Sequence, residues 1–290
     1  MSNVTSRGVL VSISCLALSC FAANSLLCRA ALREGAIDAQ SFTLIRILSG
    51  ALFLSVLAMG RGGISALRMG EWRGSAFLLA YAYCFSFSYL RLDAGIGALI
   101  LFGTVQATMV GSSIRASSRP ARSEWLGLGI ALLGLVALTL PGKSAPDLFG
   151  ALLMAGAGVA WGVYSLLAKG GKPPLYATAG NFLIAAPASL ALFYFAEAKA
   201  DITGRGVLLA AISGAITSGL GYSLWYSVAP KLGSVRAAVI QLSVPILAML
   251  GASVLMAERY SMRSVVSGVL TIVGVGIALV PRPAVDNAVK

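Results

Sequence analysis

The chain has 290 residues, of which 58% are hydrophobic and only 11% are charged, and its mean hydropathy is +0.88. Soluble domains carry about one quarter charged residues, so this composition excludes an ordinary water-soluble protein. The formal net charge of +12 does not indicate nucleic-acid binding, because the basic residues stand singly or in threes at the ends of apolar stretches and form no stripe.

Ten apolar stretches follow one another along the chain. A helix needs about 20 such residues to cross roughly 30 Å of hydrocarbon. We therefore predict an all-α integral membrane protein with ten transmembrane helices and no room for a separate loop domain. The predicted spans are residues 9–28, 40–59, 74–91, 94–114, 124–140, 148–168, 175–195, 206–229, 234–255 and 261–280.

The first stretch follows Arg7 and contains Ala22 and Ala23, which are features of a cleaved signal peptide. Its apolar run is too long for a usual signal, so we predict a retained helix. Cys15, Cys20, Cys28 and Cys84 all fall within predicted spans without metal-type spacing. Structural disulfides are therefore not expected.

The sequence contains an internal repeat with an offset of 140 positions. N-S-L-L-C-R at 24–29 returns as Y-S-L-L-A-K at 164–169, and Gly134 with Pro141 returns as Gly274 with Pro281. This predicts a first five-helix repeat over 1–143 and a second over 144–290. Because five is odd, the second repeat enters the membrane from the opposite side, as in transporters with a central cavity. A duplicated bundle without a path is the alternative.

The distribution of basic residues predicts the orientation in the membrane. With the N terminus inside, the cytoplasmic segments hold 13 Lys and Arg residues and the opposite loops hold 8. Cytoplasmic loops are enriched in these residues. The even number of spans then places both termini on the cytoplasmic side of the cell (inner) membrane.

Polar and aromatic residues inside the spans are the candidate substrate-binding residues, because such groups are costly in hydrocarbon. Amides both donate and accept hydrogen bonds, which suits an amino-acid backbone, whereas aromatic walls suit flat or apolar side chains. The alternatives are bridges between helices and lipid-facing packing. The candidates are Asn24, Tyr81, Phe85, Ser88, Phe102, Gln106, Trp161, Tyr164, Asn181, Tyr222, Trp225 and Gln241, with Thr217 and Ser218 in support.

Charged residues are rare within the predicted spans. Arg46 is the only basic residue well inside one, at a depth from which snorkelling to the interface is within reach. We expect a structural role for it, capping backbone carbonyls or anchoring a neighbouring helix, with attraction of a substrate carboxylate as the second interpretation. All ten acidic residues, Glu258 included, are expected in loops or at span edges. Without a deeply buried titratable group, we expect movement of a neutral or zwitterionic solute down its gradient.

Several features stand in a characteristic order along the chain: Phe42 with Arg46, the turns at 92–99 and 232–239, Pro245, and Glu258 followed by Gly268 and Gly274. With these features the chain resembles the EamA-type transporters of the drug/metabolite transporter superfamily. The resemblance covers nearly the whole length. It implies helices one to four and six to nine around a central cavity, with five and ten at the periphery. Within the superfamily, the chain looks most like the amino-acid and metabolite exporters, including the YddG type that exports aromatic amino acids. Val105 and Ser118 depart from the pattern, because the second repeat has Pro245 and Glu258 there.

We therefore predict a transporter, either an exporter or a facilitator, of small metabolites such as amino acids, including aromatic ones. Drugs or nucleotide-type metabolites are alternative substrates, and a channel is the alternative class. An enzyme is not expected, because the chain has no His and no paired carboxylates in its spans. No cofactor, metal or nucleic acid is expected. The expected partners are a small-molecule substrate and the lipid bilayer, with a monomer or a weak homo-oligomer.

Overall fold

The computed structural model describes residues 7–116, 122–140, 145–167, 172–195, 202–232 and 240–278. All regular structure in these ranges is helical. Residues 233–239 of the predicted turn at 232–239 lie outside these ranges, as does Ser118. The helices are α1 (Arg7–Arg33), α2 (Ala39–Gly62), η1 (Ile64–Met69), α3 (Trp72–Ser88), α4 (Ala94–Ala116), α5 (Arg122–Thr139), α6 (Leu148–Leu167), α7 (Pro174–Phe195), α8 (Gly204–Ile212), η2 (Ser213–Leu220), α9 (Gly221–Leu232), α11 (Ser243–Met256) and α12 (Met262–Ala278).

Seven helices within the described ranges are long and apolar enough to cross a membrane, and α11 and α12 are shorter apolar helices. One of the seven runs from Gly204 to Leu232 and joins α8, η2 and α9. Its middle part, η2, is a π-helix of eight residues. π-Helical turns are rare and occur often at functional sites. This widened segment is therefore a candidate part of the functional site.

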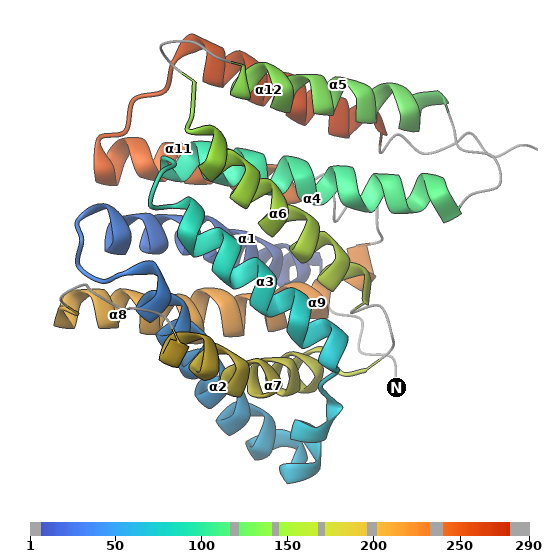
Figure 1. The fold of residues 1–290 in the computed structure, drawn as a ribbon. Coiled ribbons are helices and arrows are strands. Elements are labelled where there is room, and N and C mark those ends of the chain that lie inside the picture. The colour runs from blue at the N-terminus through green and yellow to red at the C-terminus, as the bar shows by residue number, and fades with distance from the viewer. Residues whose placement is uncertain are drawn as a thin grey trace, which may run out of the picture.

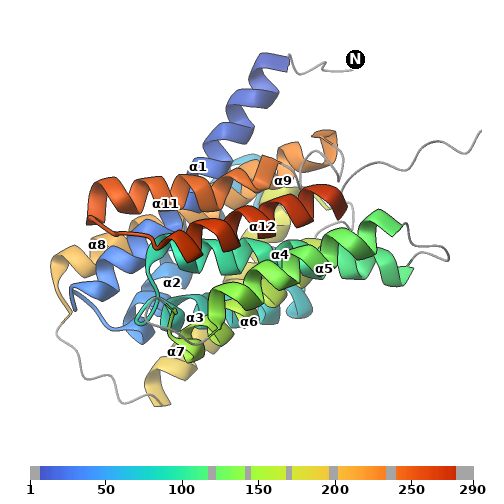
Figure 2. The ribbon, with the colours of Figure 1, turned by 90° about the horizontal axis from the view of Figure 1, so that it is seen from above.

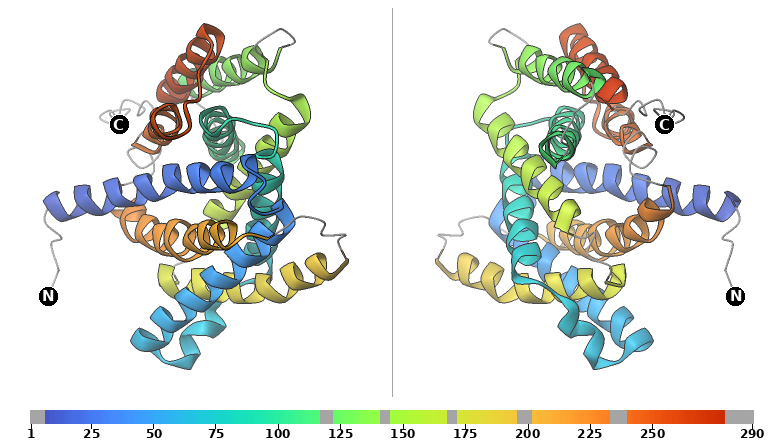
Figure 3. Two further views of the ribbon diagram at one scale, coloured as in Figure 1. Left: turned by 90° about the vertical axis from the view of Figure 1, so that its left-hand side faces the viewer. Right: turned by 90° about the vertical axis from the view of Figure 1, so that its right-hand side faces the viewer.

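The helices form a bundle with two distinct edges. Figures 1 and 3 show α5 and α12 side by side at one edge and α2 with η1 at the opposite edge. The N-terminal part of α1 projects from the bundle (Figure 2), and its side chains there, such as Val11 at 60% exposed, are open to the surroundings. The other described helices pack between these edges.

Glycines allow α5 and α12 to touch along their backbones. A Cβ atom on Gly127 would overlap the backbone of Gly274 and Ala278, and one on Gly274 would overlap the backbone of Ala131. Small residues permit this close approach in membrane helices. The faces turned away from the bundle are apolar instead: Leu133 is 68% exposed and Val254 is 81% exposed. Such surfaces suit contact with lipid tails rather than water.

Candidate solute cavity

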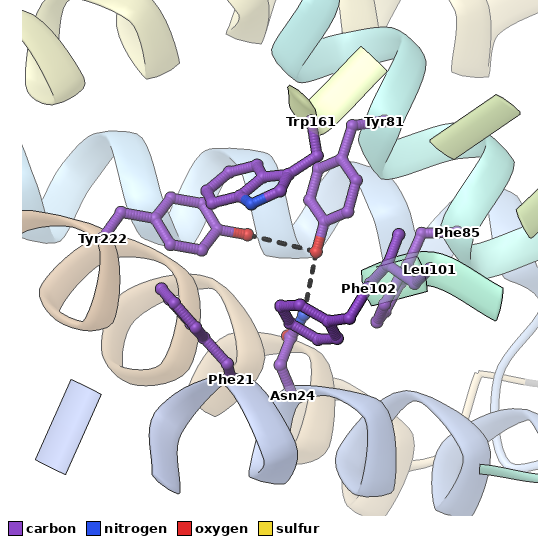
Figure 4. A pocket seen from close by; sticks show the side chains of 8 residues that line it. All are labelled: Phe21, Asn24, Tyr81, Phe85, Leu101, Phe102, Trp161 and Tyr222. Atoms are coloured by element: carbon purple, nitrogen blue, oxygen red, sulfur yellow. Dashed lines mark hydrogen bonds between the residues drawn. The ribbon is translucent and has the colours of Figure 1, made fainter. Parts of the chain in front are cut away.

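A small cavity lies where the middle parts of five helices meet (Figure 4). Its volume is about 10 Å³, which is close to the minimum that holds one water molecule. Drug-sized solutes occupy pockets of roughly 300 Å³ or more, so the cavity in this structure is too small for such a solute, and we call this arrangement the closed state. The lining residues are Phe21 and Asn24 of α1, Tyr81 and Phe85 of α3, Leu101 and Phe102 of α4, Trp161 of α6 and Tyr222 of α9.

Trp161 is the centre of the aromatic wall. Its ring centroid lies 4.4 Å from that of Tyr222 and 5.0 Å from that of Tyr81. Phe21 approaches the same indole edge-on at 6.1 Å. Tilted and edge-to-face pairs at these separations contribute about 0.5–1.5 kcal/mol each beyond the burial of area. The closed state is therefore held together by aromatic contacts between helices of both halves.

Asn24 joins this wall to the π-helical segment. Its Oδ1 accepts hydrogen bonds from Ser213 Oγ at 2.7 Å and from Thr217 Oγ1 at 3.0 Å. Its Nδ2 donates to the hydroxyl of Tyr81 at 3.3 Å, and Tyr222 donates to the same hydroxyl at 3.3 Å (Figure 4). The polar groups of the cavity wall thus hydrogen-bond to one another.

Arg46 lies behind this wall and is only 1% exposed. Its Nε donates to Ser218 Oγ at 3.0 Å, and its Nη2 donates to the hydroxyls of Tyr81 at 3.2 Å and Tyr222 at 3.0 Å. These three hydrogen bonds hold the guanidinium inside the bundle, so Arg46 does not snorkel to the interface. It links α2 to α3, η2 and α9, which agrees with the expected structural role as an anchor of neighbouring helices.

The predicted site residues fall into three groups. Six of the twelve line the cavity: Asn24, Tyr81, Phe85, Phe102, Trp161 and Tyr222. Two further aromatic residues stand next to it: Trp225 packs against Phe21 at 5.8 Å, and Tyr164 packs against Trp161 at 5.5 Å.

The other four predicted residues form bridges between helices. Gln106 donates to Gln241 at 3.0 Å. Ser88 donates to the carbonyl oxygen of Gly150 at 2.7 Å. Asn181 accepts from the backbone N–H of Glu71 at 2.8 Å and donates to Tyr164 at 3.2 Å. None of these four lines the cavity of the closed state.

Phe21 and Leu101 line the cavity but were not among the predicted residues. The repeat offset of 140 positions is the signal for both, because it pairs Phe21 with Trp161 and Leu101 with Gln241. In the structure Phe21 and Trp161 pack edge to face.

A buried ionic cluster joins α1, α4 and α11 where α1 ends. The Glu258 carboxylate accepts from the N–H of Ala94 at 3.1 and 3.0 Å and from the hydroxyl of Tyr260 at 2.7 Å. Arg29 Nε lies 3.6 Å from Glu258, and Arg29 Nη2 lies 3.2 Å from Asp93. We call these residues the Glu258 cluster: Arg29, Asp93, Ala94, Glu258 and Tyr260.

Glu258 is more deeply buried than an ordinary charged residue at the end of a membrane span. It is 7% exposed, so the expectation that no acidic group is deeply buried is wrong at this position. It follows the last turn of α11, and the packed α1 and α4 exclude water from it. Burial and the hydrogen bond to Glu258 raise the pKa of Tyr260, so its hydroxyl stays protonated and donating at neutral pH.

Comparison with known proteins identifies related chains. Residues 148–280 match the EamA-like transporter family. The uncharacterized protein PA1977 of Pseudomonas aeruginosa is 46% identical over 280 residues, which are 96% of this chain and 96% of its own. An uncharacterized transporter of Archaeoglobus fulgidus is 26% identical over 199 residues, which are 66% of this chain and 70% of its own.

A solved structure shares the fold. A protein of known crystal structure is similar over 94% of this chain and 98% of its own, with a TM-score of 0.68 and 20% sequence identity. At that identity the likeness concerns the fold alone. The 46% identity to PA1977 and the match to the EamA-like family are stronger evidence of relationship than this structural likeness. The chain therefore belongs to the same family as PA1977, and its residues 148–280 are similar to the EamA-like transporter family.

Proposed function

We propose that the protein carries small organic solutes, namely amino acids including aromatic ones, across the cell (inner) membrane by alternating access. The observation that supports this most is the closed cavity, whose wall combines Phe21, Asn24 and Tyr81 of the first half with Trp161 and Tyr222 of the second. A wall shared between two halves opens to one side or the other when the halves rock. Its aromatic rings and amide suit an aromatic amino acid.

We further propose that residues 1–143 and 144–290 are inverted repeats of five spans each. The packing of the helices supports this. A shift of 140 positions carries α1 onto α6, α3 onto η2 with α9, and α4 onto α11. Correspondingly, α1 packs on α9 and α11, and α6 packs on α3 and α4. The pairs α2 with α7, α4 with α11 and α5 with α12 also contact one another, as helices related by one pseudo-two-fold axis would.

The proposed orientation has both termini in the cytoplasm, and the 13 to 8 division of basic residues supports it. The Glu258 cluster would then lie at the outer end of the bundle. Protease protection of the two termini in oriented vesicles tests this orientation. Digestion of either terminus from the outer side would contradict it.

Replacing Trp161 with alanine is expected to reduce solute flux at least about tenfold. The indole contacts Phe21, Tyr81 and Tyr222, and three aromatic pairs at about 0.5–1.5 kcal/mol each exceed the roughly 1.4 kcal/mol that corresponds to a factor of ten. The measurement is uptake of labelled phenylalanine into proteoliposomes. Trp125→Ala is the matched control, because Trp125 is 60% exposed on the outside of α5.

The control separates cavity binding from general damage to the protein. Trp125→Ala is expected to keep the flux of the original protein. Equal flux through Trp161→Ala and Trp125→Ala would contradict the assignment of this cavity to the solute.

The second expectation is that transport does not depend on a proton gradient. The cavity lining contains no acidic residue, and the buried Glu258 is held by Ala94 and Tyr260. Flux is therefore expected to follow the phenylalanine gradient and to change less than about twofold when a pH difference is imposed, since proton-driven carriers need a titratable group on the path. Uphill accumulation driven by the pH difference alone would contradict uncoupled movement and direct attention to Glu258.

A further inference from the structure

Arg46 is a buried cation for which the described residues provide no carboxylate partner. The ion pairs among these residues involve Arg29, Arg91, Lys172 and Arg205. Arg46 instead meets neutral hydroxyls through Nε and Nη2, and its Nη1 is buried without a hydrogen-bond partner. Buried charges in proteins are normally paired. Arg46 has hydrogen bonds to neutral groups on two of its three nitrogens and no opposite charge among the described residues.

The cost of that arrangement is substantial. Taking an ion out of water costs several kcal/mol even after relaxation, and a neutral hydroxyl returns less than an opposite charge does. The rings add a partial compensation: Arg46 Cζ lies 4.9 Å from the Phe85 centroid and 5.1 Å from the Tyr81 centroid. An anionic group that reached the guanidinium would therefore gain a strong, charge-assisted hydrogen bond in a medium of low dielectric constant.

The guanidinium is in position to meet a solute. It contacts Tyr81, Phe85 and Tyr222, and these three residues form one part of the cavity wall. No lining residue carries a negative charge. The positive potential of Arg46 consequently extends through the two tyrosine hydroxyls into the cavity, where it attracts an anionic group and repels an organic cation.

We propose that Arg46 is the carboxylate-binding residue of the cavity. In the open state the carboxylate of an aromatic solute accepts a hydrogen bond from Nη1 and from the hydroxyls of Tyr81 and Tyr222, while the solute ring packs on Trp161. The substrate class is thus aromatic carboxylates and zwitterions, and organic cations are rejected. This inference rests on the proposed transport function and defines its substrate.

Two pairs of probes that differ only at the carboxylate test the inference. They are phenylalanine with phenylalaninamide, and 3-phenylpropanoate with 3-phenylpropanamide. Binding to the purified protein is measured from the ligand-induced rise of the unfolding temperature over a range of concentrations. In each pair the acid is expected to bind at least about tenfold more tightly than the amide, because a hydrogen bond between two charged groups is stronger than one to a neutral amide.

Substitutions of Arg46 test whether this residue causes the preference for the acid over the amide. Arg46→Gln is expected to bind acid and amide within about twofold of each other, and Arg46→Lys, which keeps the charge, is expected to keep part of the preference. Arg91→Gln is the control, because Arg91 is 51% exposed in its side chain and paired with Asp147; its preference should equal that of the original protein. Loss of preference with retained amide binding separates the role of Arg46 in binding from a folding defect.

Other results would overturn the inference. Equal binding of acid and amide by the original protein, binding of neither, or an unchanged preference in Arg46→Gln would each contradict it. Transport is measured separately with the same probes in proteoliposomes. Binding with the expected preference but no flux would support the role of Arg46 and contradict the proposed transport function. Flux without preference for the acid would support transport and contradict the role of Arg46.

Discussion

Replacing Glu258 with alanine is expected to lower the free energy of unfolding by about 3–5 kcal/mol, the range for removing one partner of a buried ion pair. The side chain of Glu258 is only 2% exposed, and that of Arg29 is 12% exposed. Removal leaves Arg29 with Asp93, whose side chain is 41% exposed, and leaves the N–H of Ala94 without its acceptor. The helices α1, α4 and α11 then lose the carboxylate that links them.

Thermal unfolding in detergent measures this effect. Glu71→Ala is the matched control, because Glu71 pairs with Lys172 at the surface, where their side chains are 52% and 41% exposed. Exposed pairs contribute about 0–1 kcal/mol, so the control should unfold close to the original protein. If the two variants unfolded at the same temperature, the Glu258 cluster would not be the buried ionic contact described above.

Substituting Gly214 with valine is expected to abolish flux and to lower the free energy of unfolding by about 1–3 kcal/mol or more, as overpacking does. Gly214 lies in the π-helical segment η2. A Cβ atom there would overlap the carbonyl oxygen of Arg46 and the hydroxyl oxygen of Ser49. Because the first of these is backbone, α2 and η2 must separate, which removes Arg46 from Ser218 and Tyr222.

Phenylalanine flux and thermal unfolding together measure the effect. Gly129→Ala serves as the control, because a Cβ at Gly129 meets nothing within 4 Å and alanine favours helix over glycine by about 1 kcal/mol. Gly129→Ala is expected to be neutral or slightly stabilising. Full flux through Gly214→Val would show that the contact between α2 and η2 does not position the cavity.

The sequence was sufficient to find much of the aromatic wall. Tyr81, Trp161 and Tyr222 were predicted because large polar-aromatic side chains deep in apolar spans need a protein partner. In the structure all three line one cavity. Phe21 has no aromatic neighbour one turn away in α1, unlike Phe85, which follows Tyr81 by one turn. Its correspondence with Trp161 through the repeat is the signal that indicates it.

The environment of charged residues could not be predicted in the same way. Whether Arg46 snorkels or stays inside depends on Ser218 and Tyr222, which are far away in the sequence. Glu258 follows the end of α11, and its burial comes from the backbone of α4 and the side chain of Arg29. These are tertiary contacts, and the apolar periodicity of a single span contains no information about them.

The sequence does not decide whether a buried amide binds solute or bridges two helices. Gln106, Asn181 and Gln241 are predicted solute ligands, with helix bridging as the alternative. In the closed state Gln106 bonds Gln241, and Asn181 bonds the backbone before α3. Their role in solute binding stays a prediction for the open state, because the same donors and acceptors serve either purpose.

Access to the cavity from the two sides of the membrane tests the central proposal most directly. Leu101 lines the cavity and is 2% exposed. In a variant without Cys15, Cys20, Cys28 and Cys84, Leu101→Cys is expected to react with an impermeant thiol reagent in both right-side-out and inside-out vesicles, and phenylalanine should slow both reactions. Reaction from one side only, or at a rate that phenylalanine leaves unchanged on both sides, would contradict alternating access through this cavity.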